Sequence, residues 1–226
     1  MLSLPVTRLE RSPIGLRIGA LLGAVILGAF AIWTLAPEIA MITGVNAATN
    51  APSACLAAKI AIVRGDLWTE CALGYADQLE SSTKADPDDR FSLQGAHSAA
   101  ERALSLSPHD ARAWLVLAAV DSRLSPNNPQ AIASLKMSYY TGANRPELIP
   151  LRLQISARSD ALSDSDLAQL FQQEIARIVR REARLTPAIV TAYKNASPRG
   201  KSIIENVLRD HDPRLLGQLG SVSNRP

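Results

Sequence analysis

The sequence contains no run in which β-branched residues alternate with polar ones, which is the pattern of a half-buried strand. Aromatic residues are also scarce, at 4% of the 226 residues, whereas alanine and leucine are abundant. A core with few large rings has to be built from closely packed helices of good helix formers. We therefore predict an all-α protein.

Histidine is rare as well, and its three copies, His97, His109 and His211, lie far apart. None of them belongs to a recognisable nucleophile, metal or phosphate motif. Catalytic groups need not be contiguous, so folding could still bring some of them together. The sequence favours a protein that is not an enzyme, with no cofactor and no metal site.

The chain has only two cysteines, Cys55 and Cys71, and they leave two alternatives. In an exported chain they could form a disulfide that joins neighbouring helices and closes a loop of about 16 residues. Otherwise they are buried thiols that pack as small apolar groups. Zinc binding is disfavoured because no histidine lies at ligand spacing from either cysteine.

Charge is entirely absent from Ile18 to Pro37. A helix of about 20 residues is about 30 Å long, the thickness of the hydrocarbon core of a bilayer. Phe30 and Trp33 lie near the end of this stretch, where amphipathic rings favour the headgroup layer. We predict that residues 14–36 form a transmembrane helix in the inner (plasma) membrane.

Basic residues predict the orientation of this helix. Arg8, Arg11 and Arg17 precede or begin it, whereas the first basic residue after it is Lys59. By the positive-inside rule, residues 1–13 are cytoplasmic and the rest of the chain is periplasmic or otherwise outside the cytoplasm. Export disfavours nucleic acid as a partner.

A cleaved secretory signal is the alternative interpretation of this stretch. Residues 45–47 include small side chains where a peptidase could cut. The apolar stretch is longer than the usual 7–15 residues of such signals, roughly 20, and the cleavage site would lie well past its end. An uncleaved anchor is therefore favoured, and both interpretations export the body of the chain.

Within the anchor, Gly15, Gly19 and Gly23 recur at every fourth position. Small residues at this spacing let a second membrane helix approach closely. The spacing allows a homodimer through the anchor, or docking to another membrane protein. Glycine is common in membrane helices in any case.

Residues 37–52 are almost free of charge and have no sustained helical period, so we predict a non-helical linker. Two apolar-periodic segments follow, at 53–63 and 67–79. Between them, Gly65 is predicted to make the turn and Asp66 to cap the second helix. Together they predict a helical hairpin.

Turn and cap signals continue to divide the chain into helices. Asp110 is predicted to cap a helix over 111–124, and Asn128 caps the helix that begins at Pro129. Gly142 ends that helix, and Pro146 opens another through Arg158.

Small residues on one helix and a tryptophan on the next follow a known repeat pattern. The residues that carry it are Ala96, Ala103 and Pro108, followed by Trp114, Leu117 and Ala118. Residues 67–158 thus resemble tetratricopeptide repeats, although the loop near Asp86 is long and Ala118 stands where the pattern has glycine. The resemblance implies that residues 53–158 form stacked antiparallel hairpins, an α-solenoid, with the six residues in its core.

The C-terminal region, residues 159–220, is predicted to be a helical cap on the open end of this stack. Ser163 and Asp166 resemble a capping box that starts a long helix to about Arg184. Three residues that can cap a helix, each followed by proline, are expected to open three shorter helices: Thr186, Ser197 and Asp212. Residues 221–226 form the tail.

Two features are predicted partner contacts. The spacing of Arg177, Arg180, Arg181 and Arg184 predicts one basic ridge on the long helix, either a solvated face or a site for an acidic partner. Tyr139 and Tyr140 are adjacent and point about 100° apart on a helix, so at most one belongs to the core. Tyr140 is the candidate contact residue.

These observations predict a membrane-anchored scaffold that binds protein partners in the assembly or export functions of the cell envelope. The alternative is an accessory subunit of an envelope enzyme complex, for example in polysaccharide biosynthesis or cytochrome maturation, that docks through its transmembrane helix. Anchored repeat proteins of this layout are similar to factors in both groups, and the sequence does not choose between them.

Overall fold

The computed structural model of the chain describes residues 13–45, 51–81, 87–125, 128–158 and 160–223. Every regular element in these ranges is a helix, which confirms the all-α prediction for the described part of the chain. The α-helices are α1 (Pro13–Val45), α2 (Ala51–Ala61), α3 (Gly65–Ser81), α4 (Pro87–Leu106), α5 (Ala111–Leu124), α6 (Pro129–Thr141), α7 (Ile149–Arg158), α8 (Ser165–Arg181), α9 (Thr186–Lys194), α10 (Pro198–His211) and α11 (Pro213–Ser223). The 3₁₀ helices are η1 (Pro146–Leu148), η2 (Asp160–Ser163) and η3 (Ala183–Leu185).

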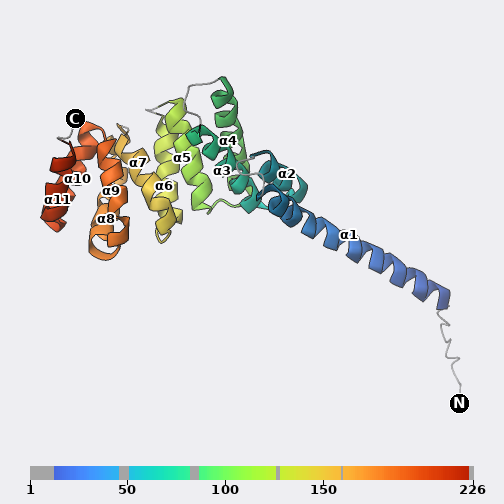
Figure 1. Cartoon of the computed structure of the whole chain (residues 1–226). Coiled ribbons are helices and arrows are strands. Elements are labelled where there is room, and N and C mark those ends of the chain that lie inside the picture. The colour runs from blue at the N-terminus through green and yellow to red at the C-terminus, as the bar shows by residue number, and fades with distance from the viewer. Residues whose placement is uncertain (1–12, 46–50, 82–86, 126–127, 159, 224–226) are drawn as a thin grey trace, which may run out of the picture.

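Figure 1 shows α1 projecting as one long helix from a body of shorter helices, with α11 at the far end of that body. Four predicted features lie wholly or partly outside the described residues: the cytoplasmic segment 1–12, the cleavage site after Val45, the loop that ends at Asp86, and residues 224–226 of the tail.

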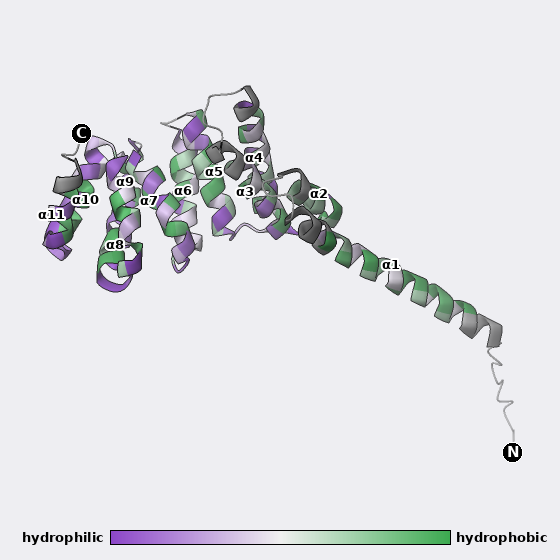
Figure 2. Cartoon of the chain, in the orientation of Figure 1, coloured by the Kyte–Doolittle hydropathy of each residue, from purple (hydrophilic) through white to green (hydrophobic). Residues whose placement is uncertain are grey.

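Figure 2 shows that α1 is hydrophobic over most of its length. Its large apolar side chains from Ile18 to Ile39 are exposed. Leu21, Ile26 and Ile32 are 68%, 67% and 72% exposed. The segment Ile18–Pro37 is long and apolar enough to span a membrane.

The predicted linker over 37–52 is wrong in its first part, because α1 continues to Val45. Residues 46–50 lie outside the described residues. A proline inside a helix removes one backbone hydrogen bond, but Pro37 is buried, and α1 packs against α2. Tertiary packing therefore extends the helix beyond the point where the sequence pattern predicts its end.

The turn between α2 and α3 also differs from its prediction. The turn lies at Ile62, whose φ is 47°, and not at Gly65. Gly65 is the first residue of α3. A β-carbon at this position would collide with the side chain of Ser107, the residue that follows α4. Asp66 lies within the first helical turn and pairs with Arg64 at 2.6 Å. This glycine is therefore explained by close helix packing and not by turn geometry.

The caps predicted around α5 and α6 are confirmed. The Asp110 carboxylate accepts a hydrogen bond from the Arg112 amide at 2.9 Å, and the Asn128 side chain accepts one from the Gln130 amide at 3.0 Å. Gly142 ends α6, and its amide donates to the Ser138 carbonyl at 3.1 Å. Local cap chemistry thus defines these helix ends.

The predicted capping box at Ser163 is wrong, because Asp164 caps α8 and accepts from the Leu167 amide at 2.9 Å. The Ser163 hydroxyl instead donates to the Asp160 carbonyl within η2. Thr186 does not act as a cap, whereas Ser197 caps α10 by accepting from the Gly200 amide at 3.2 Å. Asp212 accepts from two amides at the start of α11, each at 3.1 Å.

Helix α5 divides the apolar core into two clusters. Val116, Leu117 and Val120 pack with α2, α3 and α4, whereas Leu115 and Ala118 pack with α6 and the helices after it. The second cluster extends as far as Leu219 of α11 and so crosses the predicted boundary at residue 158. The C-terminal helices therefore share one core with α6 and α7.

Candidate functional site

The described residues of α2 and α3 contain the cysteine pair. The structure joins Cys55 and Cys71 in a disulfide that links these neighbouring helices. The six residues of the repeat pattern lie on α4, on α5 and in the turn between them. Four of them are buried (Ala96, Ala103, Leu117 and Ala118), and Trp114 is half-buried.

The half-buried position of Trp114 has a polar cause. Its indole Nε1 donates a hydrogen bond to the carbonyl of Pro108 at 2.8 Å, which ties the start of α5 to the turn after α4. Pro108 itself is exposed, so the prediction that it belongs to the core is wrong: it lies in the turn after α4 and contributes its carbonyl group. A second link joins α5 to α3, because Thr69 donates to the Asp110 carboxylate at 2.8 Å. These contacts stabilise the junction between two helical pairs.

The two adjacent tyrosines of α6 divide between core and surface. Tyr139 is 5% exposed, whereas Tyr140 is 59% exposed. Tyr140 is therefore accessible to a partner, as its proposed role requires.

The predicted basic ridge is wrong, because α8 ends at Arg181 and the chain turns at Glu182. The turn brings Leu185 of η3 onto the core, which explains why the helix stops before Arg184. Arg180 lies within 3.3 Å of a ring nitrogen of His211. Arg181 and Arg184 are exposed and lie on different helices.

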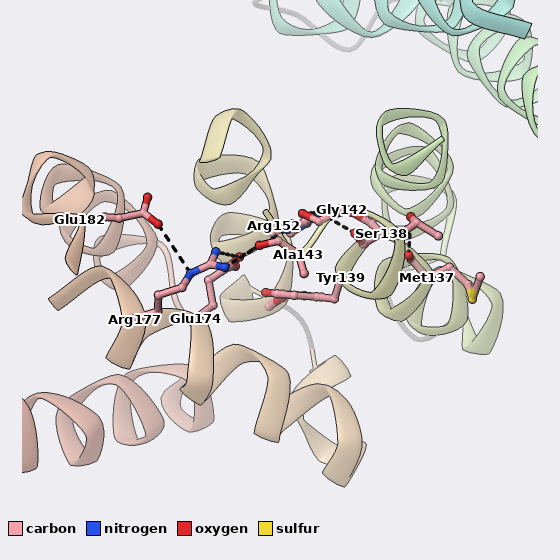
Figure 3. A network of polar contacts seen from close by, with 11 residues as sticks. Met137, Ser138, Tyr139, Gly142, Ala143, Arg152, Glu174, Arg177 and Glu182 are labelled. Atoms are coloured by element: carbon pink, nitrogen blue, oxygen red, sulfur yellow. Dashed lines mark hydrogen bonds and ion pairs between the residues drawn. The ribbon is translucent and has the colours of Figure 1, made fainter. Parts of the chain in front are cut away.

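The fourth member of that set, Arg177, points inward. It donates to the carbonyl of Ala143 and pairs with Glu174 at 3.5 Å and with Glu182 at 3.7 Å. Arg177 therefore belongs to a polar network between α6, α7 and α8, shown in Figure 3.

At the centre of this network lies Arg152 of α7, which is fully buried. Its guanidinium donates to the Ser138 hydroxyl at 2.9 Å and to the Gly142 carbonyl at 3.0 Å, and so caps the end of α6. It also pairs with Glu174 at 3.4 Å and stacks over the Tyr139 ring at 5.0 Å. One side chain thus holds three helices together.

Burial shifts the ionisation of these groups. Desolvation raises the pKa of Glu174 to about 7, although the nearby Arg152 opposes the shift. Burial also raises the pKa of Tyr139 well above its ordinary value and lowers the pKa of Arg152. A carboxyl group that titrates near neutrality is unusual, and such groups are enriched at functional sites as well as in buried ion pairs.

Sequence reasoning missed Arg152 and Glu174, yet a signal existed. Glu174 follows Phe171 by three positions and precedes Ile178 by four, so it lies on the apolar stripe of α8. Arg152 follows Leu148 by four positions and Ile149 by three, so it lies on the apolar face of its helix. A charged residue on an apolar helical face needs a buried partner.

Two hollows lie beside α8, and Gln173 lines both of them. One, of about 180 Å³, is lined by Tyr139, Ala143, Leu170, Gln173, Glu174 and Arg177. The other, of about 290 Å³, is lined by Gln172, Gln173, Ala176, Asn206, Val207, Asp210 and His211. Small-molecule sites usually have about 300–1,000 Å³, so both hollows are at or below the lower end of that range.

A smaller polar cluster joins α4 to α5. His97 lies 3.3 Å from the buried carboxylate of Asp121 and 3.5 Å from Glu101. Burial raises the pKa of Asp121. Within the described ranges, no group of three or more histidine, cysteine or acidic residues could hold a metal ion.

Compared with known proteins, the chain matches no protein-family model, no curated protein and no solved structure.

Proposed function

We propose that this protein is a membrane-anchored, non-enzymatic scaffold that presents tetratricopeptide-like helical hairpins on the periplasmic side of the inner membrane. In this proposal it binds protein partners that act in assembly or export at the cell envelope. The exposed apolar surface of α1 is the observation that carries the proposal. Such a surface is stable only where lipid or protein covers it.

The orientation rests on charge. Arg8, Arg11 and Arg17 lie at the start of α1 or before it, and the first basic residue after the span is Lys59. This asymmetry favours an N-terminus in the cytoplasm and a body on the other side. A disulfide between Cys55 and Cys71 fits an oxidising compartment.

The scaffold role rests on helix packing. Helix α3 packs against α4, and α5 packs against α6, while α5 also contacts α4 and α7. A helix that buries opposite faces in two clusters is what stacked helical hairpins require. The partner surface in this proposal includes Tyr140, Arg181 and Arg184, all of which are exposed.

The alternative is an accessory subunit that docks through α1. Gly19 and Gly23 favour it, because among the described residues nothing beyond the neighbouring backbone of α1 lies within 4 Å of a β-carbon built at either position. Together with Gly15 they leave a face that a second membrane helix can approach.

Site-specific photocrosslinking in intact cells tests the proposal. A photoreactive amino acid at Tyr140 or Arg181 is expected to capture the same envelope protein, whereas the exposed position Arg102 on α4 is the matched control. Capture that survives leucine at Gly19 and Gly23 supports the scaffold. Capture lost with those changes favours the docking alternative, and equal capture from Arg102 contradicts the proposed surface.

A further inference from the structure

Outside α1, exposed large apolar side chains on the described surface are most frequent in α2 and the turn after it. Six such side chains are exposed: Leu56, Ile62, Val63, Phe91, Leu124 and Tyr140. The first three belong to α2 and the turn after it, and the other three lie singly on α4, α5 and α6. We call Leu56, Ile62 and Val63 the α2 patch. They are 56%, 55% and 66% exposed.

The helical period of α2 separates this patch from the core. Cys55, Ala58 and Ala61 face inward and are buried. On the other side of α2, Leu56 and Lys59 are three positions apart and exposed, and the exposed Ile62 and Val63 follow in the turn after the helix. An exposed apolar surface next to a basic residue is a feature of sites that contact a membrane.

The position of α2 relative to α1 supports the same conclusion. Helix α1 packs against α2, and Pro37, the last residue of the apolar span, is buried. Beyond Pro37, α1 continues for about 12 Å to Val45, and the eleven residues of α2 extend about 16 Å. Because α2 packs against α1 and Pro37 is buried, α2 and the turn after it lie close to the end of the apolar span.

The backbone at the patch gives an independent indication. Ile62 has a φ of 47°, a conformation that β-branched residues rarely adopt and that glycine or asparagine adopts more easily. The chain thus places two β-branched apolar side chains, those of Ile62 and Val63, in an exposed and strained turn. Strain of this kind often accompanies a functional contact.

We propose that the α2 patch inserts into the outer boundary layer of the same bilayer that α1 spans. The proposal rests on the membrane anchoring proposed above and adds a second lipid contact to it. Leu56, Ile62 and Val63 lie about 5–10 Å into the boundary between headgroups and acyl chains, with Lys59 among the headgroups. The two contacts together hold the body at one fixed angle to the membrane.

Spin labels on the full chain test this depth. The chain is reconstituted in nanodiscs of phosphatidylcholine and phosphatidylglycerol, with Cys55 and Cys71 left paired. A nitroxide is attached at Val63→Cys, at Ile26→Cys in the span, or at Leu124→Cys, an exposed apolar position on α5. Collision with oxygen, which concentrates in lipid, is compared with collision with a water-soluble nickel complex.

The expected result is a several-fold higher oxygen-to-nickel ratio at position 63 than at position 124, and a still higher ratio at position 26. A lipid signal at 26 with an aqueous signal at 63 would overturn the α2 contact and leave the anchor standing. Low collision with both reagents at 63 would also overturn it, because protein would then cover the patch. An aqueous signal at 26 would refute the anchor itself.

Discussion

Replacement of Arg152 by methionine probes the contact between α6, α7 and α8 most sharply. Methionine fills much of the same volume but removes the hydrogen bonds to Ser138 and Gly142 and the pairing with Glu174. The carbonyl groups at the end of α6 then lose their cationic partner, and the buried carboxylate of Glu174 keeps only Arg177.

Loss of one partner from a buried ion pair costs about 3–5 kcal/mol, and we expect a decrease of this size in the free energy of unfolding at pH 8. The decrease should be smaller at pH 5. At that pH Glu174, whose pKa is about 7, is already neutral in the wild-type protein, so its charge no longer needs Arg152.

Urea-induced unfolding of the full chain in detergent micelles, followed by far-UV circular dichroism, measures both values. Arg158→Met is the matched control, because Arg158 lies on the same helix but is exposed, and its change should stay within about 0.5 kcal/mol. Adding Glu174→Gln to Arg152→Met should recover part of the loss. A loss no larger than that of the control at either pH would refute the role given to Arg152.

Four further changes test the fold. Alanine at both Cys55 and Cys71 should lower the free energy of unfolding by about 3 kcal/mol in urea titrations, and an unchanged midpoint would contradict the cross-link. Gly200→Ala places a β-carbon 2.5 Å from a backbone carbonyl oxygen and should cost about 1–3 kcal/mol in thermal unfolding. Gly217→Ala has open space around it and should stabilise α11 by about 0.5–1 kcal/mol, so equal effects at the two glycines would argue against this packing. Relative to Glu174→Gln, the wild-type protein should lose about 3 kcal/mol between pH 4.5 and pH 8, because a raised pKa favours the folded state only while the carboxyl is protonated; a gain over that range would contradict the burial of Glu174.

The sequence predicted those helix ends that depend on local chemistry. Asp110, Asn128 and Ser197 each cap a helix with their own side chain, a bond that needs only two or three neighbouring residues. The burial of Tyr139 and the exposure of Tyr140 also agree with their angular separation on a helix.

Features that depend on distant residues could not be predicted in this way. The sequence around Gly65 predicts a turn, but the reason for this glycine is its close contact with Ser107, which is distant in sequence. The predicted arginine ridge assumed that the helix continues to Arg184. The helix ends before Glu182, where the chain turns and packs Leu185 against the core. The Arg152 and Glu174 side chains meet across 22 positions of sequence, and no local pattern specifies that pairing.

The central claim is that α1 spans a membrane and leaves the helical body outside the cytoplasm. A fusion of alkaline phosphatase and green fluorescent protein after Pro226 measures it directly, because the phosphatase is active only outside the cytoplasm and the fluorescent protein matures only inside. We expect an active phosphatase and no fluorescence in the membrane fraction. Bright fluorescence with an inactive phosphatase would contradict the claim.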